Sequence, residues 1–159
     1  MCRTLTPLIV IAALCTSVAG AERKSWSKIR YVGGTILVKT SRYDWNTNLT
    51  ISLNPDSIEV AIAPAKAFAT LQTVHIKPSQ IGSLSYGPAA WRRVAETGGA
   101  QLPSKTPSLF GFMDHPGFLG IVYRMDDGKR AAILLDSPYF SWNILSVLRE
   151  LTGKEIERD

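Results

Sequence analysis

The sequence predicts a mainly β domain that ends in one amphipathic α-helix. Between residues 28 and 135, apolar and polar residues alternate in several stretches, as they do in half-buried strands. Clusters of turn-forming residues separate these stretches. After residue 137 the apolar period changes to that of a helix, with a stripe formed by Phe140, Ile144, Val147, Leu148 and Leu151.

The first 21 residues have the pattern of a secretory signal peptide. Arg3 precedes the apolar run 8–14, and Ala19, Gly20 and Ala21 form a small-x-small cleavage site. This run is shorter than the roughly 20 apolar residues that a transmembrane helix needs. We therefore expect export of a mature chain that begins at Glu22.

Removal of this leader takes away both cysteines, Cys2 and Cys15. A lipid anchor on Cys15 is the alternative, but the preceding Leu14 stands where lipoprotein processing requires a small residue. The mature chain then has no disulfide, no thiolate metal ligand and no cysteine nucleophile.

The remaining length suits one domain. Without the 21-residue leader, 138 of the 159 residues remain, and the formal net charge falls from +5 to +4 with the loss of Arg3. The charges alternate in sign and form no dense basic stripe, which argues against nucleic-acid binding. We expect a loose polar segment over 22–27 and a single domain over 28–156.

Seven strands are expected, over residues 28–38, 49–53, 58–62, 73–76, 81–87, 118–125 and 131–135. The Gly33-Gly34 pair predicts a bulge in the first strand. Residues 54–57 predict a hairpin turn, and Pro78 predicts a corner. Asp127-Gly128 predicts a two-residue hairpin turn with positive φ at both positions. The nearly unbroken apolar run 131–135 indicates a strand covered on both faces.

Two helices are expected. The first, over 89–96, is stopped by Gly98-Gly99, and a loop over 98–107 follows. In the second, Ser137 is expected to cap the helix, with Pro138 at its first position and Gly153 as its left-handed end.

Several phrases carry a family resemblance: residues 76–87 (IKPSQIGSLSYG), 119–123 (LGIVY), 127–129 (DGK) and 148–154 (LRELTGK). Over roughly residues 28–156 the chain resembles bacterial pleckstrin homology-like proteins, most of which have no assigned activity. The resemblance implies a barrel of about seven strands capped by one helix, in a periplasmic or secreted bacterial protein. These motifs are structural, so no catalytic residue is carried over.

Candidate catalytic residues are few. His75 lies on an expected strand, where a structural role for a neutral imidazole is the common outcome. Asp114 and His115 lie in a turn, where Asx-turn chemistry explains the aspartate. An envelope hydrolase that uses His115 with Asp114 and a nearby serine is the enzymatic alternative. Two distant histidines do not have the spacing of a zinc site, and no cofactor is implied.

Candidate ligand-binding residues fall in two places. Tyr43 and Trp45 lie with Arg42 in a turn-rich segment, where aromatic residues form either a recognition surface or a lid over the barrel end. Arg92 and Arg93 lie on the short helix, where they form either an anion site or a solvated basic face.

The function expected from the sequence is non-enzymatic binding of a protein, a peptide or an envelope component. A further alternative is peripheral attachment to anionic lipid through Lys28, Arg30 and Lys39, so membrane contact is at most peripheral.

Overall fold

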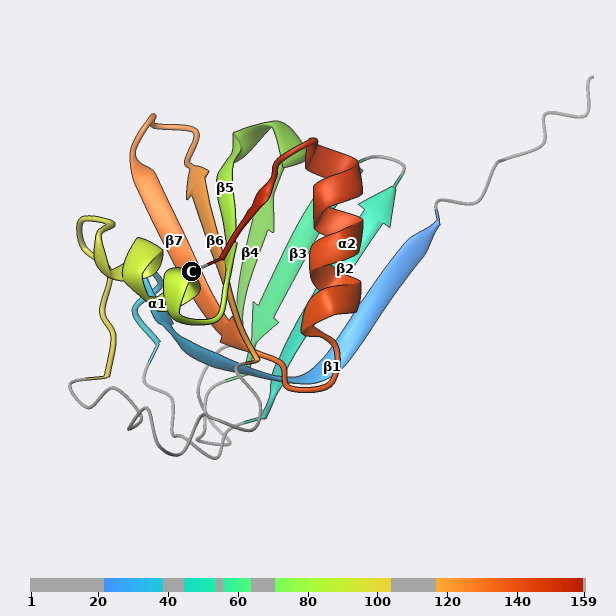
Figure 1. Ribbon diagram of the computed structural model, residues 1–159, viewed down its shortest axis with the longest axis horizontal. Coiled ribbons are helices and arrows are strands. Elements are labelled where there is room, and N and C mark those ends of the chain that lie inside the picture. Colours follow the sequence, from blue (N-terminus) through green and yellow to red (C-terminus); the bar gives the residue numbers. More distant parts are fainter. Residues whose placement is uncertain (1–21, 39–44, 54–55, 64–70, 104–116, 159) are drawn as a thin grey trace, which may run out of the picture.

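One strongly bent β-sheet and two α-helices make up the described part of the chain, residues 22–38, 45–53, 56–63, 71–103 and 117–158 of the computed structural model (Figure 1). A short 3-10 helix, η1, connects two of the strands. The elements in chain order are β1 (Arg23–Gly34), β2 (Thr47–Leu53), β3 (Asp56–Ile62), β4 (Gln72–Ile76), η1 (Pro78–Gln80), β5 (Ile81–Tyr86), α1 (Pro88–Ala95), β6 (Phe118–Arg124), β7 (Arg130–Asp136), α2 (Ser141–Thr152) and β8 (Ile156–Glu157).

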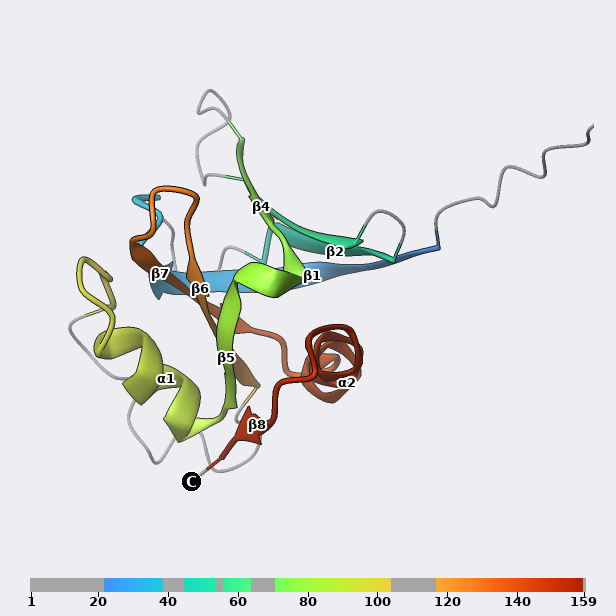
Figure 2. The ribbon, with the colours of Figure 1, turned by 90° about the horizontal axis from the view of Figure 1, so that it is seen from above.

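The strand order is β4-β3-β2-β1-β7-β6-β5-β8, and all neighbours are antiparallel except β5 and β8. Strand β1 pairs with β2 along its first part and with β7 along its second part, so the two halves of the sheet meet at an angle (Figure 2). The outer strands β4 and β8 do not pair with each other, so the sheet is not closed. A mainly β fold with a C-terminal helix is thus confirmed, with eight strands and two α-helices in the described residues.

The bend in β1 depends on its two glycines. The pairing with β7 shifts between Tyr31 and Gly33, which confirms the expected bulge. A Cβ on Gly34 would lie 2.1 Å from the Ala132 carbonyl oxygen, and Gly34 has a φ of +143°. A Cβ on Gly33 would lie 2.3 Å from the Gln101 carbonyl oxygen. The strand therefore approaches its neighbours too closely for any other residue.

The expectation of a loose segment over 22–27 is wrong. Arg23 to Trp26 pair with β2, and the carbonyl of Glu22 accepts a hydrogen bond of 2.9 Å from the Leu53 N–H. Trp26 is buried and donates its indole N–H to Asn143 of α2 at 3.1 Å. Because the other residues of this segment face solvent, its polar composition concealed a strand. The same strand ends at Gly34, so the expected continuation through residue 38 does not form.

Two hydrophobic clusters lie on opposite faces of the second half of the sheet. Helix α2 fills the angle between the two halves and covers the larger cluster, while α1 lies on the outer face (Figure 2). Strand β7 contributes side chains to both clusters. The larger cluster contains Ala131, Ile133 and Leu135, and the smaller cluster contains Ala132 and Leu134. This confirms the expectation that 131–135 is covered on both faces.

Helix α2 begins later than the sequence predicts. The helix starts at Ser141, so Ser137 and Pro138 precede it. The Ser141 hydroxyl donates to the Ser137 carbonyl and, at 3.0 Å, to the Gly117 carbonyl. The expected end is confirmed, because Gly153 has a φ of +66° and donates its N–H to the Arg149 carbonyl at 2.8 Å.

The β6–β7 turn also differs from the expectation. Within this turn only Gly128 has a positive φ. The Gly128 N–H donates to the Met125 carbonyl at 2.9 Å, and the Met125 N–H donates to the Lys129 carbonyl at 2.8 Å. The loop therefore contains one residue more than a two-residue turn, and Arg124 faces Arg130 across the hairpin. Within the described ranges, no helix is both long and apolar enough to span a membrane.

Candidate functional site: a basic groove beside helix α1

Helix α1 covers only part of the outer face of the sheet. Its eight residues extend about 12 Å, whereas a seven-residue strand such as β6 extends about 23 Å. Gly120 lies under the helix, and a Cβ there would be 3.1 Å from the Ala90 backbone. Farther along β6 on the same face, Val122 is still buried in the smaller cluster with Val94 of α1, while Arg124 beyond it is exposed.

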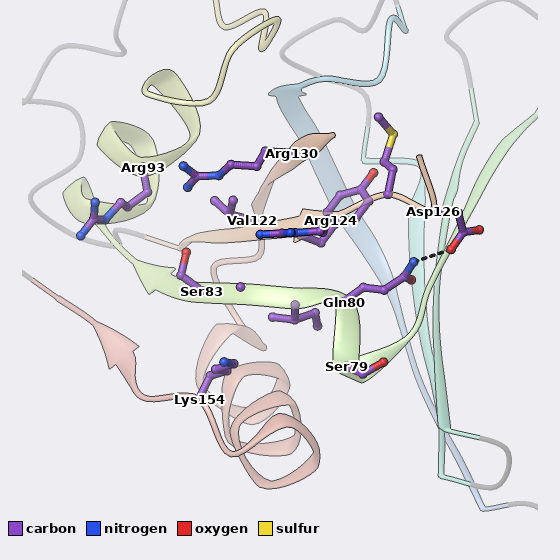
Figure 3. Close-up of a pocket in the computed structure, with 13 residues that line it drawn as sticks. Ser79, Gln80, Ser83, Arg93, Val122, Arg124, Asp126, Arg130 and Lys154 are labelled. Carbon is purple, nitrogen blue, oxygen red and sulfur yellow. Dashed lines mark hydrogen bonds between the residues drawn. The ribbon is translucent and has the colours of Figure 1, made fainter. Parts of the chain in front are cut away.

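A groove of about 860 Å³ occupies this uncovered stretch (Figure 3). Its floor comes from β5 and β6, and its walls come from α1, the β6–β7 hairpin and the segment after α2. Four cations line it, with Asp126 as the single carboxylate. The lining residues are Ser79, Gln80, Ile81, Gly82, Ser83, Arg93, Val122, Tyr123, Arg124, Met125, Asp126, Arg130 and Lys154.

Two of the four cations face each other directly. Arg124, the last residue of β6, pairs in register with Arg130, the first residue of β7, and both are exposed. Like charges directly opposite each other in a sheet destabilise it. Within the described chain, no carboxylate lies within salt-bridge distance of either guanidinium. An anion between them would relieve this repulsion.

The other two cations come from separate elements. Lys154 follows α2, and its ammonium group likewise has no carboxylate within salt-bridge distance in the described residues. Arg93, on α1, is held by Glu157 at 2.6 Å and by Glu96 at 3.2 Å. The hydrogen bond between Arg93 and Glu157 raises the pKa of Arg93 and lowers the pKa of Glu157.

The acidic residue of the groove is already engaged. The Gln80 side-chain amide donates to Asp126 Oδ1 at 2.8 Å (Figure 3), and the Lys77 N–H donates to Gln80 Oε1 at 2.8 Å. Asp126 is therefore turned toward η1 at one end of the groove. Near the middle, the Ser83 hydroxyl faces the space between Arg93 and Arg124 (Figure 3). The groove thus combines four cations with a neutral hydroxyl donor and the exposed side chain of Met125.

The sequence candidates on α1 are partly in this site. Arg93 lines the groove and binds Glu157 Oε2, while Arg92 lies 3.6 Å from Glu157 Oε1 and is not among the lining residues. Trp45 is 40% exposed and lies near Arg30, whose guanidinium carbon is 5.4 Å from the indole centroid. Arg42 and Tyr43 lie outside the described residues.

The two lipid-binding candidates that the structure describes, Arg30 and Lys28, differ in environment. Arg30 is mostly buried and binds Asp136 at 2.6 Å, so its charge is already used within the fold. Lys28 is exposed on β1, where it has a positive φ of 58° next to the register shift of that strand. Lys39 lies outside the described residues.

The residues of the hydrolase alternative, Asp114 and His115, also lie outside the described residues, as do Ala19, Gly20 and Ala21 of the expected cleavage site. His75 is on β4, as the sequence predicts, but its side chain is 69% exposed and lies 3.9 Å from Glu59.

Among the residues that the structure describes, no group of three or more histidine, cysteine, aspartate or glutamate side chains could hold a metal ion.

Comparison of the sequence with models of protein families and with curated proteins finds no match. The basic groove therefore has to be interpreted from its own geometry.

Sequence reasoning missed Arg124, Arg130 and Lys154. A signal for the first two was present, because they flank the Asp127-Gly128 turn at nearly equal distances. The two-residue turn expected there would have placed Arg124 opposite Ala131, one residue out of the observed register. Only the tertiary fold brings Lys154 to the groove, and no local pattern indicates this.

Proposed function

We propose that this protein is an exported, non-enzymatic binding module that holds an anionic ligand in the basic groove. The observation that carries the proposal is the facing pair Arg124 and Arg130, two exposed cations without a carboxylate partner in the described chain on the wall of a groove of about 860 Å³. Such a pair costs stability in the free protein, and a bound anion offsets that cost.

The pleckstrin homology-like interpretation belongs to this proposal. The order β4-β3-β2-β1-β7-β6-β5 and the position of α2 in the angle of the sheet support it, and β8 is then an addition at the β5 edge. Domains of this shape serve in many unrelated roles, so the groove rather than the fold supports the binding function.

Export is tested on the full chain. The protein is produced with its leader in a bacterial host and recovered from the periplasm or the medium. We expect the intact mass of a chain that begins at Glu22. Recovery of the uncleaved chain from the cytoplasm would contradict the exported location.

Binding is tested with labelled anionic polymers and vesicles of anionic phospholipid, in the wild type and in the variant Arg124→Glu/Arg130→Glu. The variant Arg23→Glu/Lys24→Glu changes the net charge by the same amount at the start of β1, far from the β6–β7 hairpin (Figure 1). It therefore serves as the matched control. We expect at least one probe to bind the wild type and the control variant but not the groove variant. The bound probe should be recovered chemically unchanged. Binding should weaken as salt increases, because salt screens exposed charges.

Equal binding by the groove variant and the wild type would contradict the proposal, and so would conversion of the probe. A reaction that depends on His115 would instead favour the hydrolase alternative.

A further inference from the structure

The chain itself shows how a carboxylate meets the basic side of α1. Glu157 lies on β8, an extended two-residue strand that pairs in parallel with β5. Its carboxylate contacts Arg93 Nε at 2.6 Å and Arg92 at 3.6 Å. An acidic side chain on an extended backbone is therefore already accommodated at the rim of the groove.

The remaining cations are distributed along the groove and do not converge on one point. Arg124 and Arg130 extend from the hairpin, while Lys154 lies across the floor from them (Figure 3). A compact anion such as a single phosphate would reach only some of these groups. A ligand that contacts all of them must carry several anionic groups spaced along a chain.

The floor of the groove suits a peptide better than a uniformly charged polymer. Met125, on the hairpin wall, is 38% exposed, whereas Val122 in the floor is buried, with 3% of its surface exposed. Gly82 is exposed, and a Cβ there would meet only the Val122 carbonyl oxygen, at 3.5 Å. Met125 therefore offers apolar contact for an aliphatic side chain, and the floor offers room for a backbone to approach closely at Gly82.

We infer that the groove binds an extended acidic segment of a partner protein, with its carboxylate side chains on Arg124, Arg130 and Lys154. This inference rests on the proposed function and narrows it to one class of ligand. In the free protein, Glu157 competes with such a segment for Arg93.

The test measures fluorescence anisotropy with a labelled octapeptide of alternating glutamate and valine. The matched peptide has glutamine in place of glutamate. Labelled polyphosphate and vesicles containing anionic phospholipid are the other probes. We expect the glutamate peptide to bind the wild-type protein and the glutamine peptide to bind at least about tenfold more weakly, because each charged contact contributes to affinity.

Three variants test the site. Arg124→Glu/Arg130→Glu should weaken glutamate-peptide binding by about tenfold or more, with Arg23→Glu/Lys24→Glu as the charge-matched control. Gly82→Phe should block the floor, with Gly98→Phe as the control at an exposed glycine that has no neighbouring atoms within 4 Å. Glu157→Gln should tighten binding by about two- to fivefold, because Arg93 then keeps only its ion pair with Glu96.

Circular dichroism and urea midpoints show whether each variant folds. If Gly82→Phe does not fold, the charge variants decide the question alone. Loss of affinity in Glu157→Gln would exclude competition between Glu157 and the peptide.

The outcomes separate the two proposals. If polyphosphate or vesicles bind through Arg124 and Arg130 and the glutamate peptide does not, the acidic-peptide inference is overturned while the anion-binding function stands. If no probe binds, or if every probe binds the Arg124→Glu/Arg130→Glu variant as well as the wild type, both are overturned.

Discussion

Replacement of Arg124 by glutamate should stabilise the domain while it weakens anion binding. The Cβ atoms of residues directly opposite each other in an antiparallel pair are about 5 Å apart. Two unit charges at that separation in water interact by about 0.8 kcal/mol. Because Arg124 and Arg130 are exposed and their guanidinium groups can diverge, the repulsion is smaller than this value. Reversal of one charge converts repulsion into attraction, so we expect a gain of about 0.5–1 kcal/mol.

The assay is urea unfolding followed by tryptophan fluorescence, for the wild type, Arg124→Glu, Arg130→Glu and the double variant. Each single variant should raise the free energy of unfolding in urea and, in a separate thermal melt, increase the thermal midpoint by about 2–5 °C. The double variant restores a like-charged pair and should lose most of the gain, so the effects should not be additive. Arg23→Glu, far from the hairpin, is the control. Additive effects, or destabilisation by both single variants, would refute the facing arrangement of these side chains.

Three further predictions concern the fold. Gly34→Ala should destabilise the domain by about 3 kcal/mol or more in urea unfolding, because its Cβ would lie 2.1 Å from a carbonyl oxygen of β7, whereas Gly98→Ala should be nearly neutral. Asp136→Asn should cost about 2–4 kcal/mol, since it removes the carboxylate that binds the mostly buried Arg30 at 2.6 Å. An unchanged urea midpoint would contradict a stabilising role of this ion pair. Burial raises the pKa of Tyr31 in the folded state, so its contribution to stability is complete below the unfolded pKa of about 10 and is lost as the pH rises above it. Alkaline unfolding curves of the wild type and Tyr31→Phe test this, and equal pH dependence would contradict it.

Local sequence patterns predicted most of the sheet because strands such as β2 and β3 bury one face and β7 buries both. The hairpin of β2 and β3 forms with Leu49 opposite Val60 and Ile51 opposite Ile58, as the alternation of apolar residues indicates. The amphipathic stripe likewise predicted α2 and Gly153 predicted its end, although Phe140 of the stripe precedes the helix and is 41% exposed. In these segments, local preference and tertiary burial favour the same structure.

The predictions that failed concern segments whose structure is determined by tertiary contacts and not by local preference. The start of β1 buries little besides Trp26, so its pattern resembled that of a loop. The first turn of α2 was placed too early because Pro138 is compatible with a helix start, while contacts between Ser141 and the preceding segment define the actual start. The basic groove combines cations from α1, the hairpin and the segment after α2. No single stretch of sequence contains enough of them to reveal the site.

Strand β1 couples the two halves of the sheet when the fold opens locally. Its first part is hydrogen-bonded to β2 and its second part to β7, so neither half of the sheet can detach without breaking bonds of this one strand. We therefore expect amide protons on both sides of β1 to exchange with solvent in a single concerted event. A ligand held beside the β6–β7 hairpin would then slow exchange as far away as β3, at the opposite side of the molecule.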